Sequence, residues 1–435
     1  MKTLLSTAEQ VLQANWRGGF TVPSSQLYPF QWNWDSGFIS LGHAYFNVQF
    51  AIQELESLFS GQWDNGLLPH IIFHSEEEKT YFPNFDFWDT QVNQGAPNRP
   101  KSSGITQPAV HGFILELLLE KYPDHPGLMA FAKQLFPKIV HYHRFLYTYR
   151  DPFKEGLFFI FHPWESGRDN SPLWDPSLDR IDISPKDLPS YTRRDTAIAD
   201  PSERPTTAQY DRYVYLLLLG KRHQYDGAGI ASESPFLVQD DMMNAILIKS
   251  NQSLINMGKR FGFDVAEIEE WQSQSIKQFH QKFWNERLQL FCPYDLRGQH
   301  QIEEKEIGGL IALFAHLPSN EQAQAINDYL VDLHERHYYL CPSFDVDSPY
   351  FDSKRYWRGP VWPHMNWMIY HGLKQYGFTQ TAQQVRTDTL EIVEKFGFFE
   401  YFEPQKQVAK QTPRGYGGPD FSWTASSIID LIHHP

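Results

Sequence analysis

Two segments far apart in the chain carry carboxylates in settings where a carboxylate could do chemistry. The first, residues 162–172, reads HPWESGRDNSP and holds Glu165 and Asp169 beside a tryptophan, an arginine and an asparagine. The second, residues 398–404, places Glu400 between aromatic residues. Asp, Asn, Ser and Gly also favour turns, so the first segment alone fits a turn network equally well. Glu400 alone could equally be a partly exposed residue at a helix end.

Such a pair of carboxyl groups would suit hydrolysis of a glycosidic bond. One carboxyl must be protonated to release the leaving oxygen, and an inverting enzyme needs a second, ionised carboxylate to activate water on the opposite face of the sugar. The environment has to separate the two pKa values, with that of the acid raised by an apolar or anionic setting. Trp164 and Glu165 beside Asp169 could provide such a setting.

Aromatic residues are unusually abundant, at 16% of 435 residues, with 13 Trp, 22 Tyr and 33 Phe. Aromatic rings can pack on the apolar face of a pyranose, but a bulky core explains the excess equally well. The formal net charge is −14, and no run of Lys and Arg makes a local exception. Nucleic acid is therefore not an expected partner, because its binding needs a basic surface.

The sequence predicts no metal centre. His141 and His143 are two positions apart, so they do not share a helix face and would be poor joint ligands. Asp345, Asp347 and Asp352 lack the spacing of a calcium-binding loop, and turn formation accounts for them better. We therefore expect neither a metal nor another cofactor.

Nor does the sequence predict a membrane segment. No run of about 18 apolar residues is present, and Leu4-Leu5 is too short for the apolar part of a signal peptide. The two cysteines, Cys292 and Cys341, form no CxxC motif and no disulfide framework, which suits a reducing compartment. These features favour a cytoplasmic protein.

The elements that must position these residues are helices. Twelve segments show, at least in part, the i, i+3, i+4, i+7 apolar repetition of an amphipathic helix, whereas strand signals are few. They are Thr3–Ala14, Ser36–Ser60, Thr106–Lys121, Gly127–Tyr149, Thr207–Arg222, Ser234–Arg260, Asp264–Asn285, Lys305–Ala315, Asn320–His334, Pro360–Tyr376, Thr379–Lys395 and Phe421–His433. Six consecutive pairs match an (α/α)6 toroid, although another helical array stays open because no fixed period is visible.

Two connections in this plan are much longer than usual, at about 61–105 and 150–205. Loops of this length in a compact domain are usually functional or disordered, and these are rich in aromatic residues, which favours function. No Ser/Gly linker divides the chain. We therefore expect one all-α catalytic domain over residues 1–435, with these long insertions at the active-site end of the toroid.

The segment around Asp169 resembles the ESGxDxS signature of the clan that holds trehalases and family 63 glycoside hydrolases. Glu400-Tyr401-Phe402 followed by Phe421-Ser422-Trp423-Thr424 is similar to that clan's general-base segment, in the same order and at a similar separation. Further matches along most of the chain are Gln31–Gly37 (QWNWDSG), Gln62–Gly66 (QWDNG), Gln107-Pro108, Arg204-Pro205 and Tyr356–Trp362 (YWRGPVW).

The resemblance implies an (α/α)6 barrel and an inverting mechanism, with Asp169 as the general acid and Glu400 as the general base. Glu165 and Glu403 are rivals that match the motifs less well. It also implies that the sugar contacts Tyr28, Trp32, Trp34, Asp35, Gln107, Trp164, Gly167, Trp357 and Trp362. Trp34 and Trp362 could instead be core residues, since tryptophan is often largely buried.

The compact length is similar to that of the family branch that acts on mannosylglycerate and glucosylglycerate. There the carboxylate of the leaving group must be held by a cation and hydroxyl donors, because a buried carboxylate is costly without partners. Arg204, Tyr81, Gln107, Tyr210 and Tyr356 resemble that recognition set. Arg204 could instead be a surface residue or a partner of Glu203.

The resemblance thus implies inverting hydrolysis of a small α-glycoside, with α-glucosylglycerate or α-mannosylglycerate as the expected substrate. A neutral α-glucoside such as glucosylglycerol, sucrose or trehalose stays open, as does a sugar-binding toroid without catalysis, because a fold does not fix a function. A phosphorylase would need a basic phosphate pocket and no role for Glu400. The sequence does not decide between glucose and mannose, and it leaves the oligomeric state open.

Overall fold

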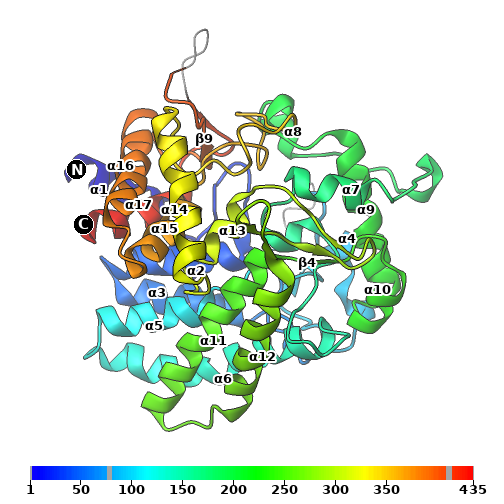
Figure 1. The fold of residues 1–435 in the computed structure, drawn as a ribbon. Helices are drawn as coiled ribbons and strands as arrows, with labels where there is room; N and C mark the ends of the chain where they lie inside the picture. Colours follow the sequence, from blue (N-terminus) through cyan, green and yellow to red (C-terminus); the bar gives the residue numbers. More distant parts are fainter. Residues whose placement is uncertain (1, 76–80, 408–413, 435) are drawn as a thin grey trace.

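Helices form most of the regular structure in the computed structural model, which describes residues 2–75, 81–407 and 414–434 (Figure 1). The longer helices are α1 (Lys2–Asn15), α2 (Asn33–Ala44), α3 (Val48–Phe59), α5 (His111–Lys121), α6 (Pro126–Tyr149), α9 (Thr207–Arg222), α11 (Asp241–Phe261), α12 (Ala266–Phe283), α14 (Asn320–Glu335), α15 (Pro363–Gln375), α16 (Thr379–Phe396) and α17 (Ser422–His433). The shorter ones are α4 (Phe85–Trp88), α7 (Asp175–Leu178), α8 (Asp195–Ile198), α10 (Gly227–Glu233) and α13 (Ile307–Ile311). The prediction of a mainly helical chain is therefore confirmed.

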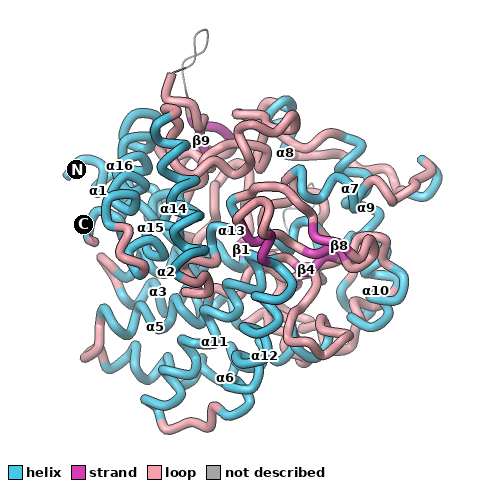
Figure 2. The backbone as a smooth tube through the Cα atoms, viewed as in Figure 1, coloured by secondary structure: helices cyan, strands magenta, loops and turns pink. Residues whose placement is uncertain are grey.

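The strands of the described residues are two or three residues long and pair in small antiparallel sheets (Figure 2). One sheet orders β1 (Gln31–Trp32), β2 (Ile71–Phe73) and β3 (Lys101–Ser102), with Gln31 opposite Ile72 and Ile72 opposite Ser102. The others are β4 (Val238–Gln239) with β7 (Tyr294–Asp295) and β8 (His300–Gln301), β5 (Trp284–Asn285) with β6 (Leu290–Phe291), and β9 (Tyr401–Phe402) with β10 (Gly415–Tyr416).

Six helices contact one another in a closed order. Helix α2 packs on α5, α5 on α11, α11 on α13, α13 on α15, α15 on α17, and α17 again on α2. Each also contacts a helix or strand outside this order, as α2 contacts α3 and α15 contacts α16. Helix α1 packs on α17, so the two ends of the described chain lie on the same side of the molecule (Figure 1).

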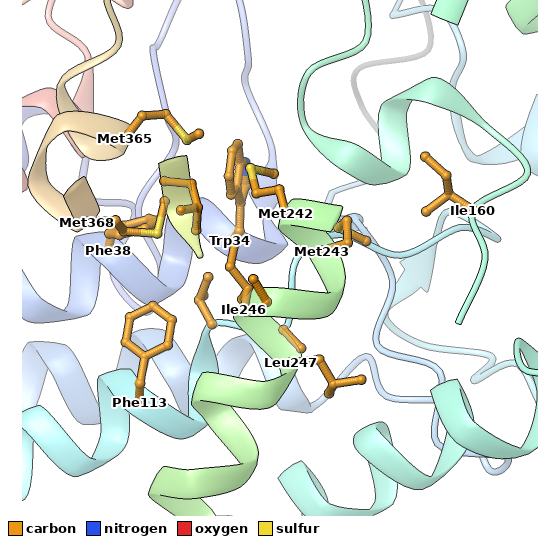
Figure 3. Close-up of a cluster of buried hydrophobic side chains, with 14 of the residues drawn as sticks. Trp34, Phe38, Phe113, Ile160, Met242, Met243, Ile246, Leu247, Met365 and Met368 are labelled. Carbon is orange, nitrogen blue, oxygen red and sulfur yellow. The ribbon is translucent and has the colours of Figure 1, made fainter. Parts of the chain in front are cut away.

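Burial separates the inner helices from the outer ones. Every residue of α2 is buried, whereas α14 buries only one face. Side chains of α2, α5, α11 and α15 converge around Trp34 in the middle of the fold (Figure 3). Gly42 of α2 allows close packing against α17, because a side chain there would collide with Ser426.

Several element boundaries differ from the predicted ones. The segment Ser36–Ser60 forms two helices, because the chain turns at residues 45–47 and Asn47 caps α3 by accepting a hydrogen bond from the backbone N–H of Gln49 at 3.0 Å. The segment Ser234–Arg260 becomes helical only at residue 241, since residues 238–239 pair as β4. The short helices α4, α7, α8 and α10 were not predicted.

The two long connections are packed rather than open. The described part of 61–105 contributes β2, β3 and α4, and residues 76–80 lie outside the described chain. The connection 150–205 contains α7, α8 and the single-turn 3-10 helices η2 (Pro163–Ser166), η3 (Pro172–Trp174), η4 (Pro185–Asp187) and η5 (Pro201–Glu203). A run of five apolar residues, 157–161, is buried in the main core. This connection is therefore anchored, and it can hold a site in place.

Candidate active site

A cavity of about 850 Å³, counted with its opening to solvent, lies where both long connections meet β1, α2 and the segment before α17. It brings together thirteen of the fifteen predicted site residues. These are Tyr28, Trp32, Trp34, Asp35, Tyr81, Gln107, Trp164, Gly167, Asp169, Arg204, Tyr210, Tyr356 and Glu400. The two carboxylates that are 231 positions apart in sequence thus line one cavity.

Asp169 follows η2 on a sharp turn of the chain. Gly167 makes this turn with a φ of +69°, and a side chain at that position would collide with the indole of Trp34. The hydroxyl of Tyr213 donates a hydrogen bond to the carbonyl of Asp169 at 2.5 Å. Burial raises the pKa of the Asp169 carboxyl to about 7, although Arg204 acts in the opposite direction. At neutral pH this carboxyl is therefore close to half protonated, as a general acid requires.

Glu400 immediately precedes β9 and is only 1% exposed. Its Oε1 accepts a hydrogen bond from the hydroxyl of Tyr28 at 3.0 Å, and its Oε2 accepts one from the backbone N–H of Gly418 at 3.2 Å. Burial raises its pKa, and the guanidinium of Arg204, with Nη1 at 3.7 Å from Oε2, counteracts this. Hydrogen bonds and a nearby cation both favour the ionised form, which suits a base.

Arg204 is a buried cation at the centre of a polar network. Its Nη2 donates to the hydroxyl of Tyr28 at 3.0 Å, its Nε donates to Oδ2 of Asp195 at 3.3 Å, and its guanidinium lies over the ring of Tyr356 at 4.1 Å. Its Nη1 is buried and has no hydrogen-bond partner among the described residues. A ligand with a negatively charged oxygen could supply that partner, because a buried unpaired donor is costly.

The other predicted leaving-group residues surround the same space. The hydroxyl of Tyr356 lies 3.3 Å from that of Tyr28. Tyr210 packs edge-on to Trp164, with ring centroids 5.8 Å apart, and Oε1 of Gln107 accepts from the backbone N–H at position 34 at 3.3 Å. The alternative that Arg204 is a surface residue is wrong, since its side chain is 5% exposed.

The structure does not bring Trp357 and Trp362 to the cavity wall. Their rings stack on each other with centroids 3.7 Å apart and an angle of 4°, and both are fully buried. Trp362 also packs on Tyr401 at 4.7 Å and on Trp423 at 5.8 Å. The pair forms a layer behind the wall, as the core alternative for Trp362 anticipated. Trp34, although 1% exposed, does line the cavity.

The two rival carboxylates lie away from the cavity. Glu165 is fully buried, where Arg150 Nη2 contacts its Oε1 at 3.0 Å and the backbone N–H of Phe161 donates to its Oε2 at 2.9 Å. Glu403 accepts hydrogen bonds from Ser353 at 2.8 Å and from Tyr416 at 3.1 Å. Neither lines the cavity. The geometry therefore favours Asp169 and Glu400 over both rivals.

Six polar or aromatic lining residues were not predicted as site residues: His70, Phe82, Arg194, Asp195, Phe421 and Trp423. Trp423 stacks on His364 with centroids 4.0 Å apart, and its position in the motif around 421–424 was the one signal that could have found it. Asp195 accepts from Nη2 of Arg193 at 2.7 Å as well as from Arg204. No periodicity marks residues 193–195, so only the fold places them at the site.

Among the described residues, no group of three or more His, Cys, Asp and Glu side chains is arranged to hold a metal ion. In the same part of the chain, no helix is both long enough and apolar enough to cross a membrane. The cavity is lined by the carboxyls of Asp35, Asp169, Asp195 and Glu400, the guanidinium groups of Arg194 and Arg204, and a wall of aromatic rings. This arrangement can bind a small polar molecule with an apolar face and deliver and accept protons at its two sides.

Known proteins of similar sequence match almost the whole chain. The family model of the mannosylglycerate hydrolase MGH1-like glycoside hydrolase domain matches residues 28–424. A mannosylglycerate hydrolase of Thermus thermophilus is 43% identical over 423 residues, which cover 97% of this chain and 99% of that protein. A glucosylglycerate hydrolase of Mycolicibacterium hassiacum is 31% identical over 444 residues, covering 99% of this chain and 97% of that protein.

A solved structure of a related protein also matches almost the whole chain. A GH63 mannosylglycerate hydrolase from Thermus thermophilus, solved in complex with Tris and D-glycerate, superposes with a TM-score of 0.92 at 41% identity and covers 99% of this chain and 100% of its own. The neutral trehalase Nth1 of Saccharomyces cerevisiae reaches a TM-score of 0.60 at 16% identity, which shows a shared fold alone.

Proposed function

Since this chain belongs to the family of MGH1-like glycoside hydrolases, we propose that it hydrolyses α-glycosides of glycerate, α-mannosylglycerate or α-glucosylglycerate, with inversion at the anomeric carbon. The chain is a glycoside hydrolase by family. The observation that carries the choice of a glycerate leaving group is Arg204, whose guanidinium is buried in the cavity that holds both carboxylates. Its Nη1 lies 3.7 Å from Oε2 of Glu400 but makes no hydrogen bond within the described residues. A carboxylate on the substrate would supply the hydrogen-bond acceptor that Nη1 lacks.

In the proposed reaction, Asp169 donates its proton to the glycosidic oxygen while the bond between that oxygen and the anomeric carbon breaks. A water on the opposite face of the ring forms the new bond to the anomeric carbon and gives a proton to Glu400. Glycerate leaves with its carboxylate intact, and the sugar leaves with inverted configuration. Asp169 ends ionised and Glu400 protonated, and exchange with solvent restores both.

The cavity residues divide between the two parts of the substrate. We assign Trp32, Trp34, Asp35, Trp164 and Gly167 to the sugar. We assign Arg204 to the glycerate carboxylate, with hydroxyl or amide groups from Tyr81, Gln107, Tyr210 and Tyr356. Tyr28 connects the two groups of residues, because its hydroxyl is hydrogen-bonded to both Glu400 and Arg204. Trp357 and Trp362 support this wall from behind, since they lie outside the lining.

We also propose that the fold is a single (α/α)6 domain over residues 1–435. The closed order of contacts from α2 through α5, α11, α13, α15 and α17 supports an inner ring of six helices. The outer ring then consists of α1, α3, α6, α12, α14 and α16. The insertions at 61–105 and 150–205 gather at the end of this ring that carries the cavity.

The test is hydrolysis by the purified protein of three substrates: α-mannosylglycerate, α-glucosylglycerate and the uncharged α-glucosylglycerol. We expect release of sugar from at least one glycerate glycoside, with a kcat/KM well above that for glucosylglycerol. Proton NMR at early times should show the β-anomer first. Faster hydrolysis of glucosylglycerol would contradict the proposed leaving group, and early α-anomer would contradict inversion.

A further inference from the structure

We propose that Arg168 is the positioning residue for the general acid: its buried guanidinium ties the backbone that carries Asp169 to the starts of helices α11 and α13. This inference rests on the proposed role of Asp169 and adds the element that fixes the acid in place. Arg168 does not line the cavity and is fully buried, so it acts through its neighbour rather than on the substrate.

The guanidinium is held by carboxylates from two helices that pack on each other. Its Nη2 donates to Oδ1 of Asp240 at 2.6 Å, and its Nη1 donates to Oε2 of Glu306. Asp240 also caps α11, accepting from the backbone N–H of Met243 at 3.2 Å. Glu306 caps α13, accepting from the backbone N–H of Gly308 at 2.5 Å. The arginine is thus bonded to the residue that caps the first turn of each helix.

The surroundings pack closely around the guanidinium. A side chain at Gly308 would collide with Nη1 of Arg168, and the ring of Trp174 lies 5.5 Å from the guanidinium carbon. A third carboxylate, Asp241, lies 3.9 Å from Nη2. Removing this cation would leave buried carboxylates without their partner, which is strongly destabilising. The site is built around a planar cation whose two Nη groups donate to different carboxylates, a shape that lysine does not reproduce.

Hydrogen bonds to the backbone groups of Arg168 and Asp169 also hold the chain at the general acid. The carbonyl of Arg168 accepts from Nε1 of Trp174 at 2.8 Å, and the carbonyl of Asp169 accepts from the hydroxyl of Tyr213 at 2.5 Å. The backbone N–H of Arg168 donates to Oγ of Ser166 at 3.0 Å. Both peptide groups that flank the Cα of Asp169 are therefore fixed, while the side chains of residues 168 and 169 reach two different environments.

Precise placement matters for an acid catalyst. A general acid must lie within hydrogen-bond reach of the leaving oxygen, and a displacement of about 1 Å can cost about 100-fold in rate. Loss of the guanidinium should therefore impair protonation of the leaving group more than substrate binding. A residue with a merely structural role would impair all substrates alike.

The experiment compares the full-length wild-type protein with Arg168→Lys and Arg168→Met on two substrates. One is the α-glycosylglycerate, whose leaving oxygen needs a proton, and the other is the matching α-glycosyl fluoride, whose fluoride needs little. We expect kcat on the glycoside to fall by about 10-fold or more, with KM within about twofold, and kcat on the fluoride to change less than about threefold. Equal losses on both substrates, or no loss on the glycoside, would overturn the inference.

Two further variants guard against a failure to fold. Asp240→Asn keeps an acceptor that can cap α11 but removes the negative charge of one carboxylate that holds the guanidinium. It should show the same selectivity between the two substrates, more weakly. Arg386→Lys is the matched control, because Arg386 is buried and donates to the carbonyl of Leu431 at 2.7 Å, away from the cavity. It should lower the melting temperature without selectivity between the substrates.

The outcome for Asp169→Asn separates this inference from the proposed function. If Asp169→Asn abolishes glycoside hydrolysis while Arg168→Lys leaves it unchanged, only the positioning role fails. If Asp169→Asn keeps wild-type activity on the glycoside, the proposed general acid itself is wrong.

Discussion

Tyr28 donates a hydrogen bond to Oε1 of Glu400 at 3.0 Å, and the same hydroxyl accepts one from Nη2 of Arg204 at 3.0 Å. The proposed base is therefore linked through one phenol to the cation that we propose binds the leaving group. At Asp169, burial outweighs the lowering effects of Arg204 and of its own backbone N–H, and the pKa rises to about 7. The tyrosine hydrogen bond at Glu400 and the dominance of burial at Asp169 give the two buried carboxyls different settings.

The first prediction concerns these roles. Asp169→Asn removes the proton donor but leaves the base, so it should lose about 100-fold or more on a glycerate glycoside and much less on a glycosyl fluoride. Glu400→Gln removes the group that activates water and should lose at least about 100-fold on both substrates. Steady-state kinetics on the two substrates measure this difference.

The rival carboxylate Glu403 provides a matched control. Glu403→Gln replaces a carboxylate outside the cavity and should retain activity on both substrates. If Glu403→Gln were inactive on both substrates while Glu400→Gln stayed folded and active, the assignment of the base would be wrong.

The second prediction is the pH dependence of kcat/KM. Burial raises the pKa of Asp169 to about 7, so the protonated acid is present below pH 7 and is lost as the pH rises through that value. Glu400 must be ionised, so activity should also fall toward low pH as its carboxylate takes up a proton. A bell-shaped profile with its alkaline limb near pH 7 is expected, and Asp169→Asn should abolish that limb in its residual activity.

The third prediction tests the link through Tyr28. Tyr28→Phe removes a hydrogen bond that lowers the pKa of Glu400, so the acidic limb of the kcat/KM profile should move to higher pH. We expect a loss of about 10-fold in kcat/KM at the optimum, the scale of one hydrogen bond to a charged group. The control is Tyr416→Phe, whose hydroxyl donates to Glu403 instead, and whose profile should not shift. An unmoved acidic limb in Tyr28→Phe would refute the link.

The two catalytic candidates and most of the cavity could be predicted from sequence because their motifs are local. Residue types and spacing alone left the ESGRDNS string and the Glu400 segment open to structural readings. Their resemblance to a known family favoured catalysis, and the comparisons confirm that family. Depth is different. Trp357 lies within the matching YWRGPVW string, yet whether an aromatic ring faces a cavity or stacks behind its wall depends on neighbours far away in sequence, here Tyr401 and Trp423 around Trp362.

The count of twelve helices shows a second limit. The predicted segment Ser36–Ser60 is α2 and α3, which adds one helix, while α9, counted among the twelve, belongs to neither of the two proposed rings. Apolar Tyr45 and Phe46 occupy the turn at 45–47, so the apolar pattern shows no break there. The two helices are separated by this turn and by Asn47, which caps α3.

The fourth prediction concerns the leaving group. Arg204→Met removes the cation that we propose binds the glycerate carboxylate, so KM for a glycerate glycoside should rise by about 10-fold or more, whereas KM for glucosylglycerol should change much less. Arg204→Lys should rescue only part of this loss, because an ammonium cannot reproduce the contacts to Tyr28 and Asp195 together. An equal rise in KM for the charged and the uncharged substrate would refute a carboxylate-binding role for Arg204.

The fifth prediction links the raised pKa of Asp169 to stability. Because the folded pKa is about 7 and the ordinary value is 3.8, the folded state holds its proton more tightly than the unfolded state. This contribution is fully present below about pH 4 and is lost as the pH rises toward 7, at about 1.4 kcal/mol per pKa unit. Asp169→Asn removes the buried charge, so its melting temperature should exceed that of the wild type at pH 8, and the gap should shrink toward pH 4. A gap that does not depend on pH would mean that burial does not disfavour the charged form of Asp169.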